Sequence, residues 1–406
     1  MTPPQGDCVT DSKPTNATPL PLQGVRVLEL GSLIAGPYAS ALFAQFGADV
    51  IKIEPPGHGD PLRKWRKLHR GTSLWWYVQS RNKKSVVLDL KSDEGREIVR
   101  KLAAEADILV ENFRPGTLEK WGLGWETLSA GNPGLIMLRI SGYGQTGPRR
   151  DLPGFAAIAE AMGGLRFVTG FADRPPVRSG VSIGDTLASM YGALGALMAL
   201  HHRNINGGKG QVVDVALYEA VFGVMESLLP EYSAQGFVRQ RSGASLPGIS
   251  PSNTYECSDG QHVVIAGNGD ALFRRLMQAI GRDDLATDPG LAHNDGRVQR
   301  NDELDAAIGA WTARHDIDEV VRVLERAEVP VGKIYSAADI AADEHYRARE
   351  MLEEHVLADG QRVTLPGIVP KLSATPGRTR WLGPALGEHT SAVLGSLAAG
   401  KKERSK

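Results

Sequence analysis

The sequence predicts an α/β protein built on an open, mostly parallel sheet, followed by a smaller α+β lobe. Three observations lead to this class. Short apolar runs that are typical of buried strands alternate with segments of helical periodicity through the first half of the chain. With 406 residues, the chain exceeds the size of one typical hydrophobic core. Near Pro230 a Gly- and Ser-rich stretch interrupts the alternation.

The first unit of the predicted sheet is a strand–helix–strand segment. "VRVLEL" (25–30) is predicted to be a buried strand, residues 31–47 turn into a helix, and "ADVIKIE" (48–54) is predicted to be the second strand. Further elements of the same layer are predicted in the strands 84–90, 106–113 and 134–141, in the helix 92–106, in a helix from Asp185, and in the segment 210–229.

After Pro230 the elements become shorter. Residues 233–260 have loop composition, "QHVVIAGN" (261–268) is predicted to be a strand, and charged helices follow to about Glu328. The predicted division of the chain is a disordered tail over 1–20, a large lobe over 21–227, a small α+β lobe over 228–330, and a return segment over 331–406 that completes the large lobe.

Composition argues against several classes of protein. A formal net charge of −1 is unlike a nucleic-acid protein held by bulk charge. Two cysteines form no disulfide framework and suit a reducing compartment. Gly and polar residues interrupt the longest apolar runs, so no membrane span is expected, and the N-terminus lacks a signal core. His201 and His202 are adjacent and diverge on a helix, so no metal site is predicted. We expect a cytoplasmic protein without nucleic-acid or membrane partners.

The segment "SGVSIGDTLASMYGALGALMALHH" (179–202) places one carboxylate, Asp185, at the start of a long apolar run. Leu187, Tyr191 and Leu194 follow at helical spacing. One interpretation is structural, because an aspartate before such a run is a common helix N-cap. The other is catalytic, a nucleophile or general base held where helix N–H groups point. The segment alone leaves both interpretations open.

The first strand–helix turn also has features of a dinucleotide site. Gly31 and Gly36 follow a strand, and Glu54 ends the next strand, where a ribose-binding acid would lie. The middle glycine of G-x-G-x-x-G is missing. "GYGQTG" (142–147) contains that pattern, but the proline-containing segment after it breaks the helix that a phosphate cradle needs. An NAD-dependent oxidoreductase is therefore a weaker alternative.

Basic residues cluster in "PLRKWRKLHRG" (61–71), in "SRNKKS" (80–85) and in "ENFRPGTLEK" (111–120). A solvated charged face is one interpretation of these clusters. The other is a binding site for a phosphate-bearing ligand with an aromatic base, because tryptophans such as Trp75 and the ring of Phe113 lie among the charges.

Together these segments resemble the class III CoA-transferase family. The resemblance runs from about Leu22 to about Leu394, and its specificity lies in the order and spacing of several motifs. These motifs are "GVRVLELGSLIAGPYASALFAQFGADVIKIEPPGHGDPLR", "RNKKSVVLDL", "ADILVENFRPG", "GYGQTGP", "GDTLASMYGALGALMAL", "GKGQVVDVALYEAV" and "LGEHT".

The resemblance implies a fold, an assembly and a reaction. It implies a large Rossmann-like lobe built from the N- and C-terminal segments, a smaller lobe, and an interlocked homodimer. The aspartate of the "GD" pair is the family's nucleophile, which corresponds to Asp185 here. CoA would move from an acyl-CoA, with succinyl-CoA as the expected donor, to a small acid, which we expect to be dicarboxylic. No tightly bound cofactor is implied, because the CoA thioester is a substrate.

The family pattern also implies binding residues. For CoA it falls on Leu88, Asp89, Leu90, Lys91, Asn112, Phe113, Arg114 and Lys120, with Tyr143 and Gly144 bordering the pocket. Of these, Lys91, Arg114 and Lys120 would meet phosphates. Near the acid substrate it falls on Ile34 and Ala35, and Arg63, Arg66 and Arg81 would meet a second carboxylate. The glycine loop that covers the site in related enzymes would be "RSGASLPG" (241–248) or "AGNGD" (266–270).

Departures from the family pattern bear on the substrate. Formyl-CoA transferase has a glutamine at the place of Ile34 and an arginine at the place of Pro55, so formyl-CoA and oxalate are not expected substrates. The α-methylacyl-CoA racemases of the same superfamily pair the aspartate with a histidine. Here Phe155 takes that place, and a phenylalanine cannot carry a proton. A racemase and a non-catalytic CoA-binding protein are the remaining alternatives.

Overall fold

The computed structural model describes residues 19–403, so almost all of the predicted tail over 1–20 lies outside the described residues. The chain forms two compact units, which are described separately. The first comprises Met1–Glu160, Ser182–Val221 and Glu353–Lys406, and the second comprises Ala161–Val181 and Phe222–Leu352. In this division residues 161–181 and 331–352 belong to the second unit, whereas the sequence places both stretches in the large lobe.

The first unit is built on a six-stranded parallel sheet with the order β5-β2-β1-β6-β7-β8. The chain runs outward from β1 through β2 to β5, then returns to β6 and continues to β8 on the other side. The strand order therefore reverses between β1 and β6, the point where ligands bind in doubly wound sheets. The six strands are β1 (Arg26–Glu29), β2 (Asp49–Glu54), β5 (Lys83–Val87), β6 (Ile108–Glu111), β7 (Ile136–Ser141) and β8 (Val212–Ala216). They confirm the predicted parallel α/β sheet.

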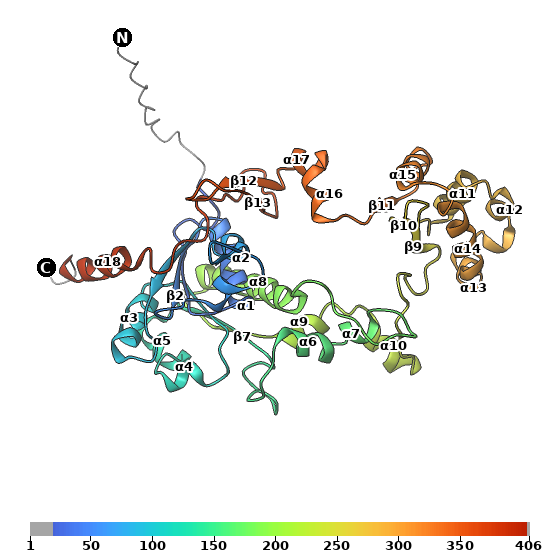
Figure 1. The fold of residues 1–406 in the computed structure, drawn as a ribbon. Coiled ribbons are helices and arrows are strands. Elements are labelled where there is room, and N and C mark those ends of the chain that lie inside the picture. The colour runs from blue at the N-terminus through green and yellow to red at the C-terminus, as the bar shows by residue number, and fades with distance from the viewer. Residues whose placement is uncertain (1–18, 404–406) are drawn as a thin grey trace, which may run out of the picture. The chain divides into compact units, whose positions relative to one another are not determined.

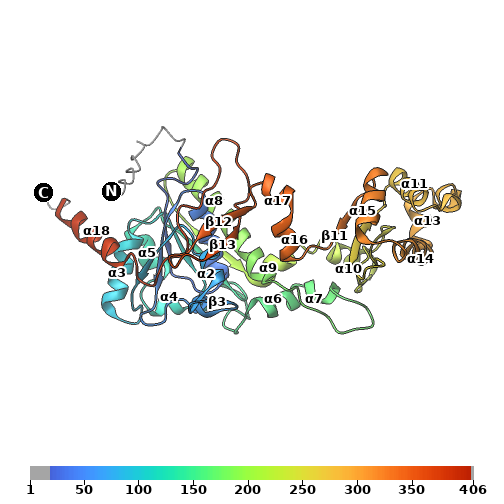
Figure 2. The same cartoon turned by 45° about the horizontal axis from the view of Figure 1, so that its top comes forward.

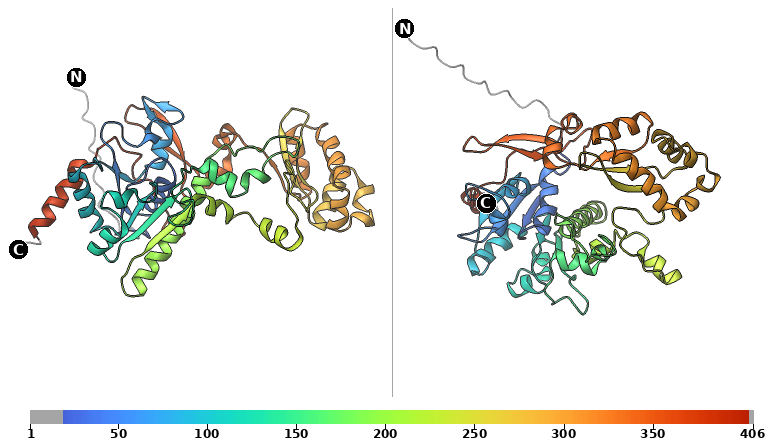
Figure 3. Two further views of the ribbon diagram at one scale, coloured as in Figure 1. Left: turned by 90° about the horizontal axis from the view of Figure 1, so that it is seen from below. Right: turned by 45° about the vertical axis from the view of Figure 1, so that its right-hand side comes forward.

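Alternating side chains of these strands pack into two hydrophobic cores, one on each face. Val27 of β1 and Ile108 of β6 face a core that includes α1 and α8. Their neighbours Leu28 and Leu109 face the opposite core, which includes α3, α5 and α18. Each buried Val, Leu or Ile stabilises the fold by roughly 1.5–3 kcal/mol. Figure 1 and Figure 3 show the helices on the two faces.

The other elements follow in chain order. The helices are α1 (Ala35–Gln45), η1 (Pro61–Lys64), α2 (Leu74–Gln79), α3 (Asp93–Ala103), α4 (Thr117–Lys120), α5 (Trp125–Gly131), α6 (Ala156–Met162), α7 (Leu165–Val168), α8 (Ile183–Ile205), α9 (Leu217–Phe222), α10 (Leu228–Gln235), α11 (Asp270–Ala279), α12 (Asp283–Ala286), η2 (Pro289–Leu291), α13 (Asn294–Gln299), α14 (Asn301–Thr312), α15 (Ile317–Arg326), α16 (Ala337–Ala342), α17 (Glu344–Ala348) and α18 (Thr390–Glu403). The remaining strands are β3 (Leu68–His69), β4 (Thr72–Ser73), β9 (Ser252–Glu256), β10 (His262–Ala266), β11 (Val331–Lys333), β12 (Leu352–Val356) and β13 (Arg362–Pro366).

Helix α8 is longer and more continuous than the sequence suggests. Gly192 and Gly195 lie inside it without interrupting it, and a Cβ on Gly192 would come 3.1 Å from a methyl of Leu138. Among the described residues, α8 alone has the length and apolar composition of a membrane-crossing helix, which differs from the expectation of no such run. Its small residues, such as Ala188, pack into the core shared with α1.

The second unit has its own small sheet and hydrophobic core. Strands β9, β10 and β11 pair antiparallel in the order β11-β10-β9. Helices α11, α14 and α15 contribute the buried side chains Phe273, Ile308 and Val320 to this core. Figure 2 shows these helices grouped together.

Candidate active site

The loop between β1 and α1 lies at the reversal of strand order, and Asn112 at the end of β6 fixes it. The Asn112 side chain accepts a hydrogen bond from the Ser32 N–H and donates one to the Ser32 carbonyl, both at 2.9 Å. A Cβ on Gly31 would approach Asn112 Oδ1 to 2.8 Å, so only glycine fits there without displacement. The predicted ligand residue Asn112 is thus a structural link between the two central strands.

A pocket of about 250 Å³ opens beside this loop. Its apolar wall includes Leu88, Leu90, Phe113 and Trp121, and the Phe113 and Trp121 rings meet edge to face with centroids 5.3 Å apart. The loop contributes its own first residues to the rim, and Lys91 brings a positive charge. An aromatic and aliphatic wall beside a cation fits a flat base that carries phosphate groups.

The structure brings half of the predicted CoA residues to this pocket. The lining includes Leu88, Asp89, Leu90, Lys91 and Phe113.

The other half lie elsewhere. Arg114 and Lys120 are exposed in the segment that leads from Phe113 to Trp121, and neither lines the pocket. Tyr143 and Gly144 follow β7, where the next N–H, that of Gln145, donates to Asp214 at 2.9 Å.

The sequence analysis missed other lining residues. Trp121 lies eight positions after Phe113, with one short helical turn between them. This spacing could have predicted that Trp121 lines the same apolar wall as Phe113. His58 lines the pocket after β2 without any pattern that marks it. Pro55, which the sequence analysis named only as a departure from formyl-CoA transferase, lines the pocket as well. Glu111 orients Phe113 by accepting its N–H at 2.7 Å. Burial raises the pKa of Glu111, although Arg139 lies 2.7 Å away.

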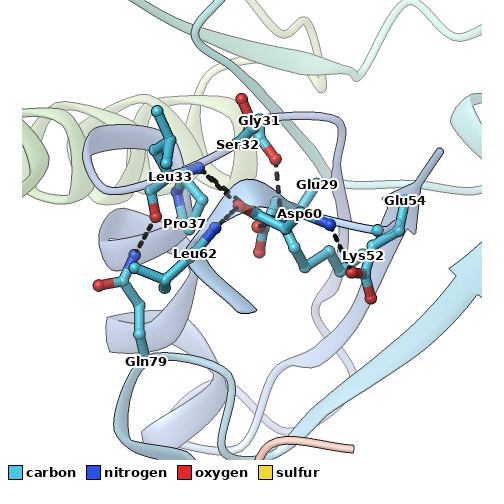
Figure 4. A network of polar contacts seen from close by, with 12 residues as sticks. Glu29, Gly31, Ser32, Leu33, Pro37, Lys52, Glu54, Asp60, Leu62 and Gln79 are labelled. Carbon is cyan, nitrogen blue, oxygen red and sulfur yellow. Dashed lines mark hydrogen bonds and ion pairs between the residues drawn. The ribbon is translucent and has the colours of Figure 1, made fainter. Parts of the chain in front are cut away.

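A buried network of charges supports the loop from below (Figure 4). Lys52 Nζ lies 2.7 Å from Glu29 and 2.8 Å from Asp60, and it also donates to the Gly31 carbonyl at 2.8 Å. Lys83 Nζ lies 2.8 Å from the second oxygen of Glu29. All four ionic side chains are at most 1% exposed.

The network keeps Glu29 ionised. Burial alone would raise the pKa of Glu29, but Lys52 and Lys83 lower it to about 2. Burial alone would lower the pKa of Lys52, but Asp60 and Glu29 raise it above its usual range. Fully paired buried charges of this kind are strongly interdependent, since removal of one partner leaves another uncompensated.

Several basic residues of the predicted clusters are internal rather than solvated or ligand-facing. Arg63 binds Glu54 through two nitrogens at 2.7 and 2.8 Å, donates to the Pro384 carbonyl at 3.1 Å, and stacks 3.7 Å from the Trp76 ring. Glu54 is therefore occupied by Arg63 and does not present a ribose-binding carboxylate.

Arg81 has internal partners as well. It is 3% exposed and donates to the Pro366 carbonyl at 2.9 Å and to Glu353 at 3.4 Å. With Arg63 and Arg81 engaged inside the protein, the structure offers no support for their predicted contact with a substrate carboxylate. The third arginine of that prediction, Arg66, is exposed, and its guanidinium lies 5.2 Å from the Trp75 ring.

Asp185 is the third residue of α8, and it is not the N-cap that the structural interpretation predicted. The helix begins at Ile183 with Ser182 as the N-cap, because residues 183 and 184 already adopt helical geometry. Gly184 packs against Ala156, where a Cβ would come 3.3 Å from the Ala156 Cβ. Asp185 remains in the first turn and is half-buried, where the helix dipole favours a negative charge.

One hydrogen bond ties the Asp185 helix to the loop that lines the pocket. Ser189 Oγ, one turn after Asp185, lies 2.6 Å from the Asp185 carbonyl and donates at 2.7 Å to the carbonyl of Ala35. Ile34 and Ala35 are themselves buried, and neither lines the pocket. The site thus joins an ionisable carboxylate and an aromatic pocket through one short loop.

Two further predictions from the sequence concern Phe155 and the glycine loop. Phe155, at the place of the racemase histidine, is 72% exposed. The segments 241–248 and 266–270 belong to the second unit, where Arg297 donates to the Ser250 carbonyl at 3.0 Å and to the Asn268 carbonyl at 2.9 Å. Their role as a cover of the site stays a prediction.

The family model described as CoA-transferase family III matches residues 22–390. The chain is 51% identical over 380 residues to succinyl-CoA–D-citramalate CoA-transferase of Chloroflexus aurantiacus, covering 93% of this chain and 94% of that protein.

It is 43% identical to the alpha subunit of succinyl-CoA–L-malate CoA-transferase of Chloroflexus aurantiacus, covering 94% and 90% of the two chains. A CAIB/BAIF family protein of Brucella suis has a crystal structure that matches with a TM-score of 0.84 and 34% identity, covering 94% of this chain and all of that one.

Proposed function

This chain belongs to CoA-transferase family III, and on that premise we propose that it moves CoA from succinyl-CoA to a small dicarboxylic acid with Asp185 as the nucleophile. The observation that carries the proposal is the link through Ser189, which joins the Asp185 turn of α8 to the loop that lines the pocket.

The reaction begins at the thioester. A carboxylate oxygen of Asp185 attacks the thioester carbon, the tetrahedral intermediate collapses, and CoA leaves as a thiolate, which gives a mixed anhydride. The thiolate then attacks the Asp185 carbonyl, so that succinate leaves and Asp185 carries CoA as a thioester.

The acceptor completes the exchange in the same way. Its carboxylate attacks the aspartyl thioester, CoA leaves as a thiolate, and a second mixed anhydride forms. The thiolate attacks the acceptor's carbonyl, which yields the new acyl-CoA and returns Asp185 as a free carboxylate. The first step needs an ionised Asp185, and the first turn of α8 favours that state.

The pocket supports CoA as the carrier. Its wall of Leu88, Leu90 and Phe113 suits the adenine ring, and Lys91 lies where a phosphate of the same molecule would be neutralised. In the described part of the chain, Lys91, Arg114 and Lys120 form no ion pair, so the three cations remain available to phosphates.

The choice of a dicarboxylic acceptor rests on the relatives. Citramalate and malate, named for two of them, are hydroxylated dicarboxylic acids. A racemase would need a proton carrier opposite Asp185, and the exposed Phe155 provides none. We therefore expect exchange between acids rather than epimerisation.

We further propose that the active assembly contains a second copy of the chain. Met190, Leu194 and Met198 recur every four residues on α8 and are 53%, 49% and 61% exposed, and they make an apolar stripe that another subunit would cover. Light scattering of the purified protein tests this, because a monomer at micromolar concentration would contradict it.

The experiment for the function is a transfer assay. Succinyl-CoA is incubated separately with citramalate, malate, glutarate and itaconate, and the CoA esters are separated by chromatography. We expect one or more of the new esters with an equal amount of succinate, and Asp185→Asn should form none. No ester with any of the four acids would contradict the proposed substrates, and full activity of Asp185→Asn would contradict the nucleophile.

A further inference from the structure

The loop from Gly31 to Ile34 contains a residue in an unfavourable backbone conformation. Leu33 has a φ of 63°, in the left-handed region that side chains with a Cβ avoid. The sequence has no glycine at this position to relieve it. Such a conformation persists only where the surroundings hold it.

Two buried side chains hold Leu33, one at its backbone N–H and the other at its backbone carbonyl (Figure 4). The Leu33 N–H donates to both oxygens of Asp60, at 3.0 and 3.2 Å. Gln79 Nε2, at the end of α2, donates to the Leu33 carbonyl at 2.5 Å and reaches the Ile34 carbonyl at 3.3 Å. Asp60 and Gln79 are 1% and 2% exposed.

We infer that Asp60 and Gln79 are positioning residues that hold Leu33 in its left-handed conformation and so set the place of the pocket relative to Asp185. Both hold the same loop. Before Leu33, this loop lines the pocket through Gly31 and Ser32. After Leu33, the Ala35 carbonyl accepts the hydrogen bond from Ser189 of the Asp185 helix.

Asp60 is also fixed from its other side. One of its oxygens lies 2.8 Å from Lys52, and the other accepts the Leu62 N–H at 2.8 Å. The carboxylate therefore cannot follow Leu33 if the loop relaxes. The loop is held between this anchored carboxylate and the amide of Gln79, and loss of either contact lets Leu33 move to an ordinary conformation.

Gln79→Met tests this inference better than a substitution of Asp60 would. It removes the amide, keeps the length of the side chain and leaves the charge of the protein unchanged. The left-handed conformation of a leucine is disfavoured by about 5- to 30-fold relative to ordinary backbone. We expect Gln79→Met to lower kcat by about tenfold, within this range, while the Kd of CoA changes less than about threefold.

A double-mutant cycle separates positioning from general damage. Glycine adopts a positive φ at almost no cost, so in a chain that already carries Leu33→Gly the Gln79→Met substitution should lower kcat by less than about threefold. An equal loss in both backgrounds would overturn the inference, and so would an unchanged kcat in Gln79→Met alone.

Asn132→Ala is the matched control. Asn132 also donates its amide to two carbonyls, those of Ala103 and Ala106 at 2.9 and 2.8 Å, at the end of the sheet opposite the loop. It should keep the wild-type kcat. A tenfold loss in Asn132→Ala would show that any lost amide has this effect, which would overturn the inference.

This inference rests on the proposed function for its kinetic readout, and hydrogen exchange separates the two. If the wild-type protein transfers no CoA, the proposed function fails. The Leu33 amide, bonded to Asp60, should still exchange about tenfold faster in Gln79→Met, in proportion to the expected loss of the held conformation. Exchange at the wild-type rate would overturn the positioning role independently of activity.

Discussion

Glu29 is the member of the buried network whose replacement gives the most decisive measure of its strength. It lies between Lys52 at 2.7 Å and Lys83 at 2.8 Å, and it is fully buried. Its pKa falls from 4.5 to about 2 in the folded protein. At about 1.4 kcal/mol per unit, ionised Glu29 contributes on the order of 3 kcal/mol to the free energy of unfolding near neutral pH.

The substitution Glu29→Gln removes the charge and keeps the shape. Among the described residues, Lys52 then keeps Asp60 as an ion-pair partner and Lys83 keeps none. Removal of one partner from a buried ion pair typically costs about 3–5 kcal/mol. Urea unfolding at pH 7 should show a loss of this size. Adding Lys83→Met to the same chain should recover part of it, since the unpaired charge is then gone.

The loss should depend on pH in a defined direction. Because the folded pKa of Glu29 lies below the unfolded one, its stabilisation is complete above about pH 5 and disappears as the pH falls from 4.5 toward 2. Wild type and Glu29→Gln should therefore converge in acid. Glu105→Gln is the control, because its pair with Arg26 is exposed and worth about 0–1 kcal/mol. A loss for Glu29→Gln no larger than that of Glu105→Gln would refute the reasoning.

Two further predictions concern the loop and the pocket. Gly31→Ala places a Cβ 2.8 Å from Asn112 Oδ1 and should destabilise the protein by about 1–3 kcal/mol in thermal unfolding. Gly131→Ala is the control, because a Cβ there has nothing within 4 Å and should not destabilise the protein. Equal unfolding midpoints for the two variants would contradict the packing argument. Lys91→Ala should weaken CoA binding by about 3- to 10-fold in calorimetry and reduce its dependence on salt, and an unchanged Kd would place the phosphates elsewhere.

The sheet could be predicted from the sequence because its signal is local. Strands such as β1 are short runs whose apolar side chains, such as Val27 and Leu28, alternate between two cores. The strand order needs information that no local pattern carries. It follows from pairings such as Val27 with Ile108, which are far apart in the chain.

The charged residues show that local composition does not predict whether a charged side chain is buried. Lys83 stands in a basic cluster whose composition resembles an exposed face, and Lys52 stands in a predicted strand, yet both are buried. Their partner Glu29 is 23 residues from Lys52, and nothing near any of the three marks the pairing. A basic cluster has the same composition whether its charges meet solvent, phosphate or a buried carboxylate.

The candidate site was predictable in part for a similar reason. The functional weight given to Asp185 came from the family motif, and its exact place in the helix came from the structure, where Ser182 takes the cap. Phe113, which the resemblance assigns to CoA binding, lines the pocket. Gln79 lacks any local mark of its contact with Leu33, because that contact joins residues 46 positions apart.

The central claim is that Asp185 becomes covalently acylated, and intact mass spectrometry tests it most directly. The protein is incubated with succinyl-CoA and trapped with hydroxylamine, alongside Asp185→Asn, and the modified peptide is sequenced. We predict a hydroxamate on Asp185 in the wild-type protein and no modification of the variant. An unmodified Asp185 during measurable CoA transfer, or a modification on another residue, would contradict the account.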